Sequence, residues 1–327
     1  MAEARAAHHG GTGMSASSPA SPPSGRPGPP LAPSDLAALR PRSHARRKTV
    51  DALIKVSAWV AASFGIAVML LIVFEVVRRG IGAIDWAFFT ELPPVVGEEG
   101  GGLGNAILGT LVITFVAALI ALPVGFLGGV WLAEFGRNGR IATGVRMVAN
   151  VNMGIPSIVV GVFVFAALVK PLQHYSGMAG SIALAFIMLP VMARTTEDIL
   201  NLVPNELRES GLAMGVPRWR VTLGVVIRAA RSGLITGAVL ATVRVAGETA
   251  PLLLTALSSP YWLNGLFGPE GFFGGPTANL TKTVYDFSGM PYSRMQELAW
   301  GGALLIIVAV LGLNVLMRLI FQRGKEW

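Results

Sequence analysis

The chain has 327 residues, a formal net charge of +8 and a mean hydropathy of +0.61. Because 53% of its residues are hydrophobic and only 13% are charged, against about 25% charged residues in a soluble domain, the composition predicts a membrane protein. The chain contains no cysteine, which excludes disulfides, thiolate metal sites and cysteine nucleophiles.

Residues 1–48 are rich in Pro, Gly, Ser and Ala and contain almost no large apolar side chains. Such a segment cannot bury enough surface to offset the chain entropy lost on folding, so we expect a disordered cytoplasmic tail. The first 50 residues hold no apolar core followed by a small-residue cleavage site. We therefore expect no cleaved signal peptide, and the first apolar segment should remain as an anchor.

Six segments are apolar enough to cross a bilayer, which takes roughly 20 helical residues. They predict an all-α polytopic membrane protein with six transmembrane helices. The second segment is an uncharged run of 31 residues, whereas the third is short and begins at a proline. In chain order the segments are 56–77, 103–133, 156–169, 178–199, 233–257 and 298–321.

The placement of Lys and Arg orients these spans. One set of flanking segments carries 18 Lys and Arg residues, and the opposite set carries five. Because cytoplasmic loops are enriched in Lys and Arg, both termini and the 194–231 loop are expected in the cytoplasm. The 258–297 loop is rich in glycine, proline and aromatic residues, and we expect it to form an irregular cap on the outer surface.

The sequence contains none of the common nucleotide-binding or hydrolytic motifs. A Walker A loop needs Gly-Lys-Ser/Thr, and none of the five lysines has that context. His-Glu-x-x-His and Gly-x-Ser-x-Gly are also absent, and three of the four histidines lie in the N-terminal tail. No metal site, cofactor or catalytic site is therefore predicted, and any ATP-driven work must be done by another chain.

A polar segment, 203–227, separates the fourth and fifth apolar spans. Pro204 near its start and Gly215, which precedes a second proline, predict a short helix of about three turns. Glu209 and Gly215, with aliphatic residues at 225 and 227, fall on the spacing Glu-x5-Gly-x9-Ile-x-Leu. This spacing resembles the cytoplasmic coupling loop of permease subunits in ABC importers, and the resemblance implies a helix that fits a groove on a separate ATPase subunit.

On this helix, Arg208 and its two glutamate neighbours are expected to be accessible, and Gly211 to permit the close approach of a partner. The segment departs from the pattern at Ser210 and Gly211, which replace alanines, and at Arg228, which replaces a proline. The alternative interpretation is an ordinary amphipathic helix on the cytoplasmic membrane surface. The residues predicted to couple to the ATPase are Glu206, Glu209, Gly211, Ala213 and Gly215.

A second polar group lies inside the predicted fifth span. Arg244 is about 11 residues beyond Gly233, hence roughly 16 Å along a helix and near the middle of a ~30 Å hydrocarbon core. A charge there costs at least about 2.5–3.5 kcal/mol, so it normally faces a partner or a water-filled path. Glu248 is expected one turn further on the same face, with Thr242 and Thr249 nearby. Two interpretations remain open: a structural ion pair, or a path in which Arg244 binds an oxyanion and Glu248 tempers the attraction.

Two more features are candidates for the transport path. Arg194 lies near the cytoplasmic end of the fourth span, where the orientation rule alone also explains an arginine. Ser157 follows Pro156, which can begin a helix whose free N–H groups attract an anion. Broken helices at such positions mark substrate sites in some transporters, but a simple helix start with glycines for close packing is the alternative.

Several motifs together resemble one family, the PstA-type permease subunit of bacterial phosphate ABC importers, over roughly residues 100–320. The most specific is GETAPLL within RVAGETAPLLLTA (244–256), supported by GIPSIVVG (154–161). The remaining matches are WLAEF (131–135), LPVMARTTEDIL (189–200), VPNELRESGLAMGVPRWR (203–220) and AWGGALLIIVAVLGLN (299–314).

The resemblance implies that residues 49–327 adopt the type I ABC importer permease fold in the cell inner membrane. It implies import of inorganic phosphate, with Arg194, Arg244 and Glu248 at positions that resemble the family's phosphate path. The implied partners are a homologous PstC-type permease, a PstB-type ATPase dimer, a PstS-type phosphate-binding protein and membrane lipid, with no nucleic acid. Alternatives are a permease for sulfate or molybdate, a signalling or scaffold subunit, and a secondary transporter, which would not need a coupling loop.

Overall fold

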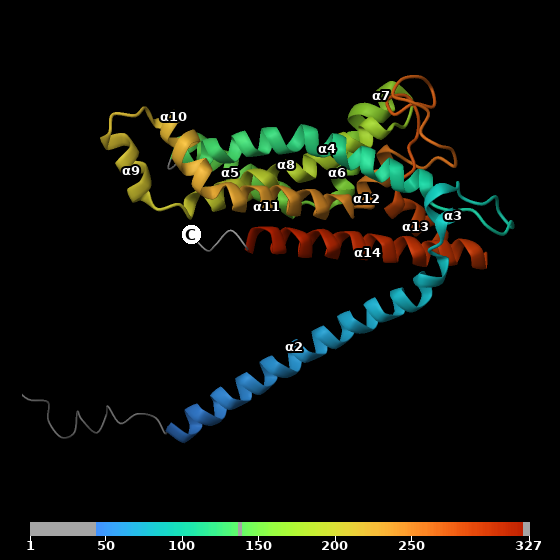
Figure 1. Cartoon of the computed structure of the whole chain (residues 1–327), viewed down its shortest axis with the longest axis horizontal. Helices are drawn as coiled ribbons and strands as arrows, with labels where there is room; N and C mark the ends of the chain where they lie inside the picture. Colours follow the sequence, from blue (N-terminus) through green and yellow to red (C-terminus); the bar gives the residue numbers. More distant parts are fainter. Residues whose placement is uncertain (1–43, 137–138, 323–327) are drawn as a thin grey trace, which may run out of the picture. The chain divides into compact units, whose positions relative to one another are not determined.

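The computed structural model describes residues 44–136 and 139–322, and every regular element in those ranges is a helix (Figure 1). The all-α prediction is therefore confirmed for the described part of the chain. The chain divides into two units, one ending at Ile66 and the other beginning at Ala67. The second unit contains all of the predicted site residues.

The described part of the first unit is the beginning of a long helix, α2 (His44–Gly80). Its side chains from residue 48 to residue 66 are all exposed, and most of them are apolar. Disorder is predicted for residues 1–48, but the last five residues of that segment already belong to α2. The rest of that segment, residues 1–43, lies outside the described residues.

The second unit is built around α8 (Gly177–Asn201), which packs against both α4 (Gly104–Val130) and α11 (Ile227–Ala246). Of the candidate spans, α8 is the most enclosed: 61% of its apolar window is buried, against 28% or less in the others. Figure 1 shows α9 (Asn205–Ala213) at one end of these helices and α13 (Leu280–Ser288) at the other. The fully buried side chains between the three helices include Ile113, Leu184, Met188 and Val245.

The other elements are shorter helices, the C-terminal helix, and three π-helical segments that continue α-helices without a gap. The C-terminal α14 (Ser293–Gln322) packs against α13 and α11. The π-helical segments are η2 (Trp131–Gly136), η3 (Phe165–Val169) and η4 (Thr222–Val226). The remaining elements are η1 (Ile81–Ala83), α3 (Trp86–Thr90), α5 (Arg140–Gly154), α6 (Ser157–Val164), α7 (Lys170–Leu172), α10 (Arg218–Val221) and α12 (Ala250–Thr255).

Five helices among the described residues are long and apolar enough to cross a membrane. A sixth span is reached if α5 and the helix that begins at Ser157 count as one, although they meet at an angle of 102°. The predicted third span, 156–169, is therefore only the second arm of a bent pair. The predicted fifth span, 233–257, is wrong as one continuous helix: it begins earlier, at Arg218, and ends at Ala246. A separate short helix, α12, follows because Pro251 favours a new helix start.

The predicted outer loop, 258–297, is also more ordered than expected. It contains α13, and α14 begins within it at Ser293. The side chain of Asn279 caps α13 by accepting a hydrogen bond of 3.0 Å from the backbone N–H of Lys282. Because Asn at an N-cap satisfies a free helical N–H group, this residue fixes where the ordered part of the cap begins.

Small residues let α4 lie directly against α8. An added Cβ atom on Gly129 would lie 2.5 Å from the Cβ atom of Thr196 and would also meet the carbonyl oxygen of Ala193. By contrast, an added Cβ atom on Gly144, in α5, would meet nothing within 4 Å. Close packing of backbones through glycine is a common way for membrane helices to associate.

We expect Gly129→Ala to lower the free energy of unfolding by about 1–3 kcal/mol, because the extra methyl group must push α4 away from α8. The measurement is the melting temperature of the purified transporter in detergent. The matched control is Gly144→Ala, which adds the same methyl group in open space and should leave the melting temperature equal or slightly higher. Equal melting temperatures for the two variants would contradict this account of the α4–α8 contact.

Candidate functional site

Two interrupted helices meet beside α8. The α5–α6 pair bends between Gly154 and Ser157, and the α11–α12 pair is interrupted at residues 247–249. The two second arms, α6 and α12, pack closely: an added Cβ atom on Gly161 would lie 2.7 Å from the Cα atom of Pro251. The ends of four helices, with their unpaired backbone groups, are thereby brought to one place.

A pocket of about 180 Å³ lies at these two interruptions. It brings together Ser157, Arg244 and Glu248, three of the residues predicted for a transport path, from separate parts of the sequence. The volume is below the roughly 300–1,000 Å³ of pockets for drug-sized organic molecules, so it suits a small ion. The other lining residues are Asn152, Met153, Ile155, Val160, Ile187 and Val191.

Asn152 is the polar lining residue that sequence reasoning missed. It lies in the last turn of α5, and its backbone carbonyl accepts a hydrogen bond from the N–H of Ile155 at the bend. The available signal was its position, four residues before the proline that begins the next arm. Among the described residues, no group of three His, Asp or Glu side chains is arranged to hold a metal ion.

Arg244 and Glu248 share the pocket, but the predicted geometry of the pair is wrong. The α11 helix ends at Ala246, so Glu248 lies beyond it, with its backbone N–H donating to the carbonyl of Val245 at 3.0 Å. Within the described residues, neither side chain makes an ion pair or a hydrogen bond. The interpretation of a self-neutralising ion pair is therefore not supported. The helix also begins at Arg218, so Arg244 is about 39 Å along it rather than 16 Å.

The segment around α13 holds the interruption at Glu248 in place. The hydroxyl of Thr281, in the first turn of α13, donates to the backbone carbonyl of Glu248 at 3.0 Å. The side-chain amide of Asn279 donates to the carbonyl of Leu257 at 3.1 Å, just beyond α12. Thr249, which is also predicted for the path, immediately precedes α12 and does not line the pocket.

Arg194 is not brought to this pocket. It forms ion pairs with Glu197 at 3.1 Å and Asp198 at 3.3 Å on its own helix, α8. Glu197, which is 2% exposed, also accepts a hydrogen bond of 2.6 Å from Arg146 of α5. These residues border a second, larger pocket of about 490 Å³ that also contains Arg208. The structure therefore separates Arg194 from the group formed by Ser157, Arg244 and Glu248.

The predicted short helix of the 203–227 segment is present as α9. It follows Pro204, ends at Ala213, and is succeeded by Gly215 with a positive φ of 76°, a conformation that glycine adopts without strain. Glu206 and Glu209 are exposed, as are Ala213 and Gly215. These four residues are therefore accessible to a partner chain.

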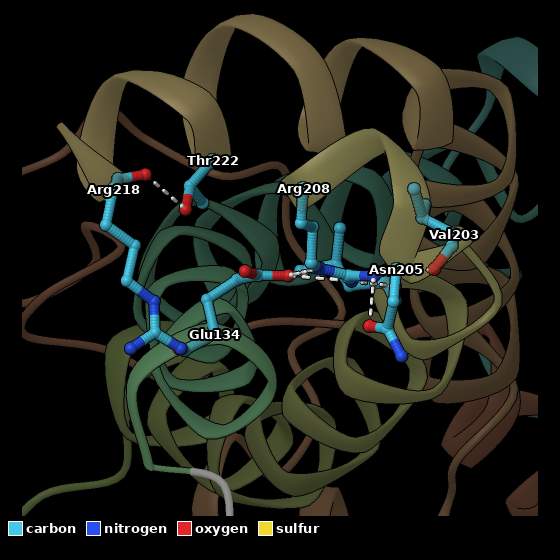
Figure 2. Close-up of polar contacts among 7 residues, drawn as sticks. Glu134, Val203, Asn205, Arg208, Arg218 and Thr222 are labelled. Atoms are coloured by element: carbon cyan, nitrogen blue, oxygen red, sulfur yellow. Dashed lines mark hydrogen bonds and ion pairs between the residues drawn. The ribbon is translucent and has the colours of Figure 1, made fainter. Parts of the chain in front are cut away.

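Two details of the coupling prediction are wrong. Gly211 is buried against Val221 of its own chain. An added Cβ atom at Gly211 would lie 2.9 Å from both γ-carbons of Val221. Arg208, expected to be accessible, is only 8% exposed. Its Nε and Nη2 atoms donate to one carboxylate oxygen of Glu134 at 2.9 and 2.8 Å, as Figure 2 shows.

Glu134 is a further residue that sequence reasoning did not single out. It is 2% exposed, and its backbone carbonyl accepts a hydrogen bond from Arg218. The available signal was that it is the first charged residue after the uncharged run of the second span. A buried carboxylate in that position requires a cationic partner, but its partner, Arg208, is 74 residues away in the sequence.

The helical fold, the bent spans and the exposed loop helix α9 agree with one class of protein, the membrane-spanning component of an ABC importer, and comparisons with known proteins show this class. Residues 125–325 match the family model described as "Binding-protein-dependent transport system inner membrane component". A solved structure of the MetNI methionine ABC transporter in an inward-facing conformation has a similar fold, with a TM-score of 0.56 and 19% identity. The match covers 68% of this chain and 96% of that one.

Comparison with individual relatives shows to which family of ABC importer permeases the chain belongs. The PstA phosphate transport system permease protein of Yersinia pestis is 41% identical over 287 residues, covering 88% of this chain and 95% of the relative. That of Pasteurella multocida is 42% identical, covering 86% and 97%. A probable PstA permease of Methanocaldococcus jannaschii is 35% identical, covering 76% and 85%. The chain belongs to the PstA permease family, and it is a multi-pass protein of the inner membrane.

We expect Thr281→Val to raise the apparent KM for uptake by roughly 2- to 10-fold, the effect of losing one hydrogen bond of about 0.5–1.5 kcal/mol. The physical reason is that the carbonyl of Glu248 loses its partner on α13 and the interruption can shift. The measurement is uptake of phosphate, the substrate in the relatives' names, by cells carrying the complete transporter. Thr281→Ser keeps the hydroxyl and is the control; a KM equally raised in both variants would contradict a role for this hydrogen bond.

Proposed function

We propose that this chain is the permease subunit of an ATP-driven importer of inorganic phosphate, and that Arg244 binds the ion during translocation. The observation that carries this proposal is an arginine without an ion-pair partner in a small pocket between two helix interruptions. Its planar guanidinium matches the geometry of a tetrahedral oxyanion. The N-terminal end of α6, at Ser157, adds free backbone N–H groups and a favourable helix dipole.

Glu248 gives this pocket a reason to accept phosphate in preference to sulfate or molybdate. Near neutral pH a phosphate ion still carries one or two protons, and a protonated oxygen can donate a hydrogen bond to a carboxylate. Sulfate and molybdate carry no proton there, so the same carboxylate only repels them. The negative charge also limits how tightly any anion is held, which favours release.

The energy for transport is proposed to come from partner chains. In this proposal, a PstB-type ATPase dimer binds the exposed face of α9, and a PstC-type permease supplies the other half of the path. A PstS-type protein delivers phosphate at the outer cap, and both termini lie in the cytoplasm with α9. Closure of the ATPase dimer moves α9, and the path then alternates between outward and inward openings. Arg194, on the larger cytoplasmic-side pocket, is proposed as a later contact of the ion.

We expect Arg244→Gln to reduce phosphate uptake at least about tenfold, because charge-assisted hydrogen bonds to the ion are lost. The measurement is uptake of labelled phosphate in cells that lack the wild-type chain, together with co-purification of the partner subunits to confirm assembly. Arg228→Gln is the matched control, since Arg228 is an exposed arginine on the same helix and does not line the pocket. Full uptake by Arg244→Gln would remove this residue from the mechanism.

We expect Glu248→Gln to weaken the discrimination between phosphate and sulfate by roughly tenfold or more, because the repulsion of an unprotonated anion is removed. The measurement is inhibition of labelled phosphate uptake by increasing concentrations of sulfate. Glu270→Gln, which neutralises an exposed glutamate outside the pocket, is the control and should behave like wild type. If sulfate inhibits all three proteins equally, Glu248 does not select the ion.

A further inference from the structure

The end of the second span is a point where three other elements attach. This end is the π-helical segment η2, and arginines from α5, α9 and α10 all donate to it. Arg146 donates to the carbonyl of Leu132 at 3.1 Å, Arg208 donates to the carboxylate of Glu134, and Arg218 donates to the carbonyl of Glu134. Segments of π-helix leave backbone carbonyls available and often occur at functional sites.

Arg208 is the side chain that ties the loop helix α9 to the spans. Besides Glu134, it donates to the carbonyl of Leu200 in the last turn of α8 at 2.7 Å and to that of Val203, just beyond α8, at 2.6 Å. One guanidinium therefore joins α9, η2 and the end of α8. The apolar packing of α9 is instead directed at η4 and α10, where Gly211 meets Val221.

The pair is buried, which makes the connection rigid. Glu134 is 2% exposed and Arg208 is 8% exposed, so the ion pair is largely shielded from bulk water. Arg218 closes the other side of Glu134, with its guanidinium carbon 5.5 Å from the ring centre of Phe135. A buried pair with all of its donors used is held in one geometry, whereas an exposed ion pair is not.

We propose that Glu134 is a positioning residue for energy coupling: through Arg208 it fixes α9 to α4 and α8, so that ATP-driven displacement of α9 moves both spans together. This inference rests on the proposed function, in which α9 docks on the ATPase. The span that α9 thereby moves, α8, packs against α4 and α11, and Ile187 and Val191 of α8 line the Arg244 pocket. A displacement of α9 is thus transmitted through α8 to the Arg244 pocket.

The test separates coupling from docking by measuring two rates in the same preparation. The complete transporter, with its ATPase and binding protein, is reconstituted in liposomes, and phosphate uptake and ATP hydrolysis are recorded together. Glu134→Gln keeps the shape of the side chain and removes its charge. We expect its ATP hydrolysis to stay within about threefold of wild type, while the phosphate transported per ATP falls at least about tenfold. Glu99→Gln is the control: Glu99 is an exposed glutamate in the loop between α3 and α4, and this variant should keep the wild-type ratio.

Two outcomes would overturn the inference. One is an unchanged amount of phosphate per ATP in Glu134→Gln; the other is a proportional fall in both rates, which is what a purely structural or docking role produces. If Glu134→Gln does not assemble, Arg208→Lys decides the question. It keeps the charge opposite Glu134 but cannot reach all three acceptors, so the ratio should fall by a smaller factor in the same direction, and an unchanged ratio would overturn the inference. Failure of the wild-type transporter to take up phosphate would instead contradict the proposed function.

Discussion

A backbone that leaves the α-helix inside a bilayer must find new hydrogen-bond partners, because lipid offers none. The two helix interruptions beside α8 have such partners within the chain. The end of α11 and the start of α12 lie against the bend between α5 and α6, and Thr281 of α13 supplies a donor for the carbonyl of Glu248. The irregular backbone at both interruptions thus lines the Arg244 pocket. In this pocket an ion could contact polar side chains.

Two groups of polar contacts hold elements together toward the two ends of the helix bundle. One group, near α13, holds the interrupted helices, and the other, near α9, holds the ends of the spans. In the second group each buried carboxylate, Glu134 or Glu197, has arginines from at least one other element. Between the groups, α8 is packed by small and apolar side chains on α4. A rigid helix with a polar attachment at each end is well suited to transmit a displacement along its axis.

The same physical reasoning distinguishes Arg244 from the arginines that already have ion-pair partners within the chain. Arg194 and Arg208 already have carboxylate partners, so their donors are engaged within the chain. Arg244 has none among the described residues, and its pocket holds a carboxylate that makes no ion pair with it. A guanidinium with unused donors gains more from an incoming anion than one that must first give up a partner.

By itself, the sequence determined the features that depend on neighbouring residues. Long apolar runs located the first, second, fourth and sixth of the predicted spans, and Pro204 and Gly215 located the ends of α9, because such signals act within one or two turns. Only the tertiary structure decided what Arg208, Gly211 and Glu248 contact. The partner of Arg208 lies 74 residues away, and Gly211 packs against Val221 of its own chain. Glu248 lies beyond the end of α11, and its backbone carbonyl accepts a hydrogen bond from Thr281. Hydropathy and spacing carry no information on such contacts, since they depend on where distant segments pack.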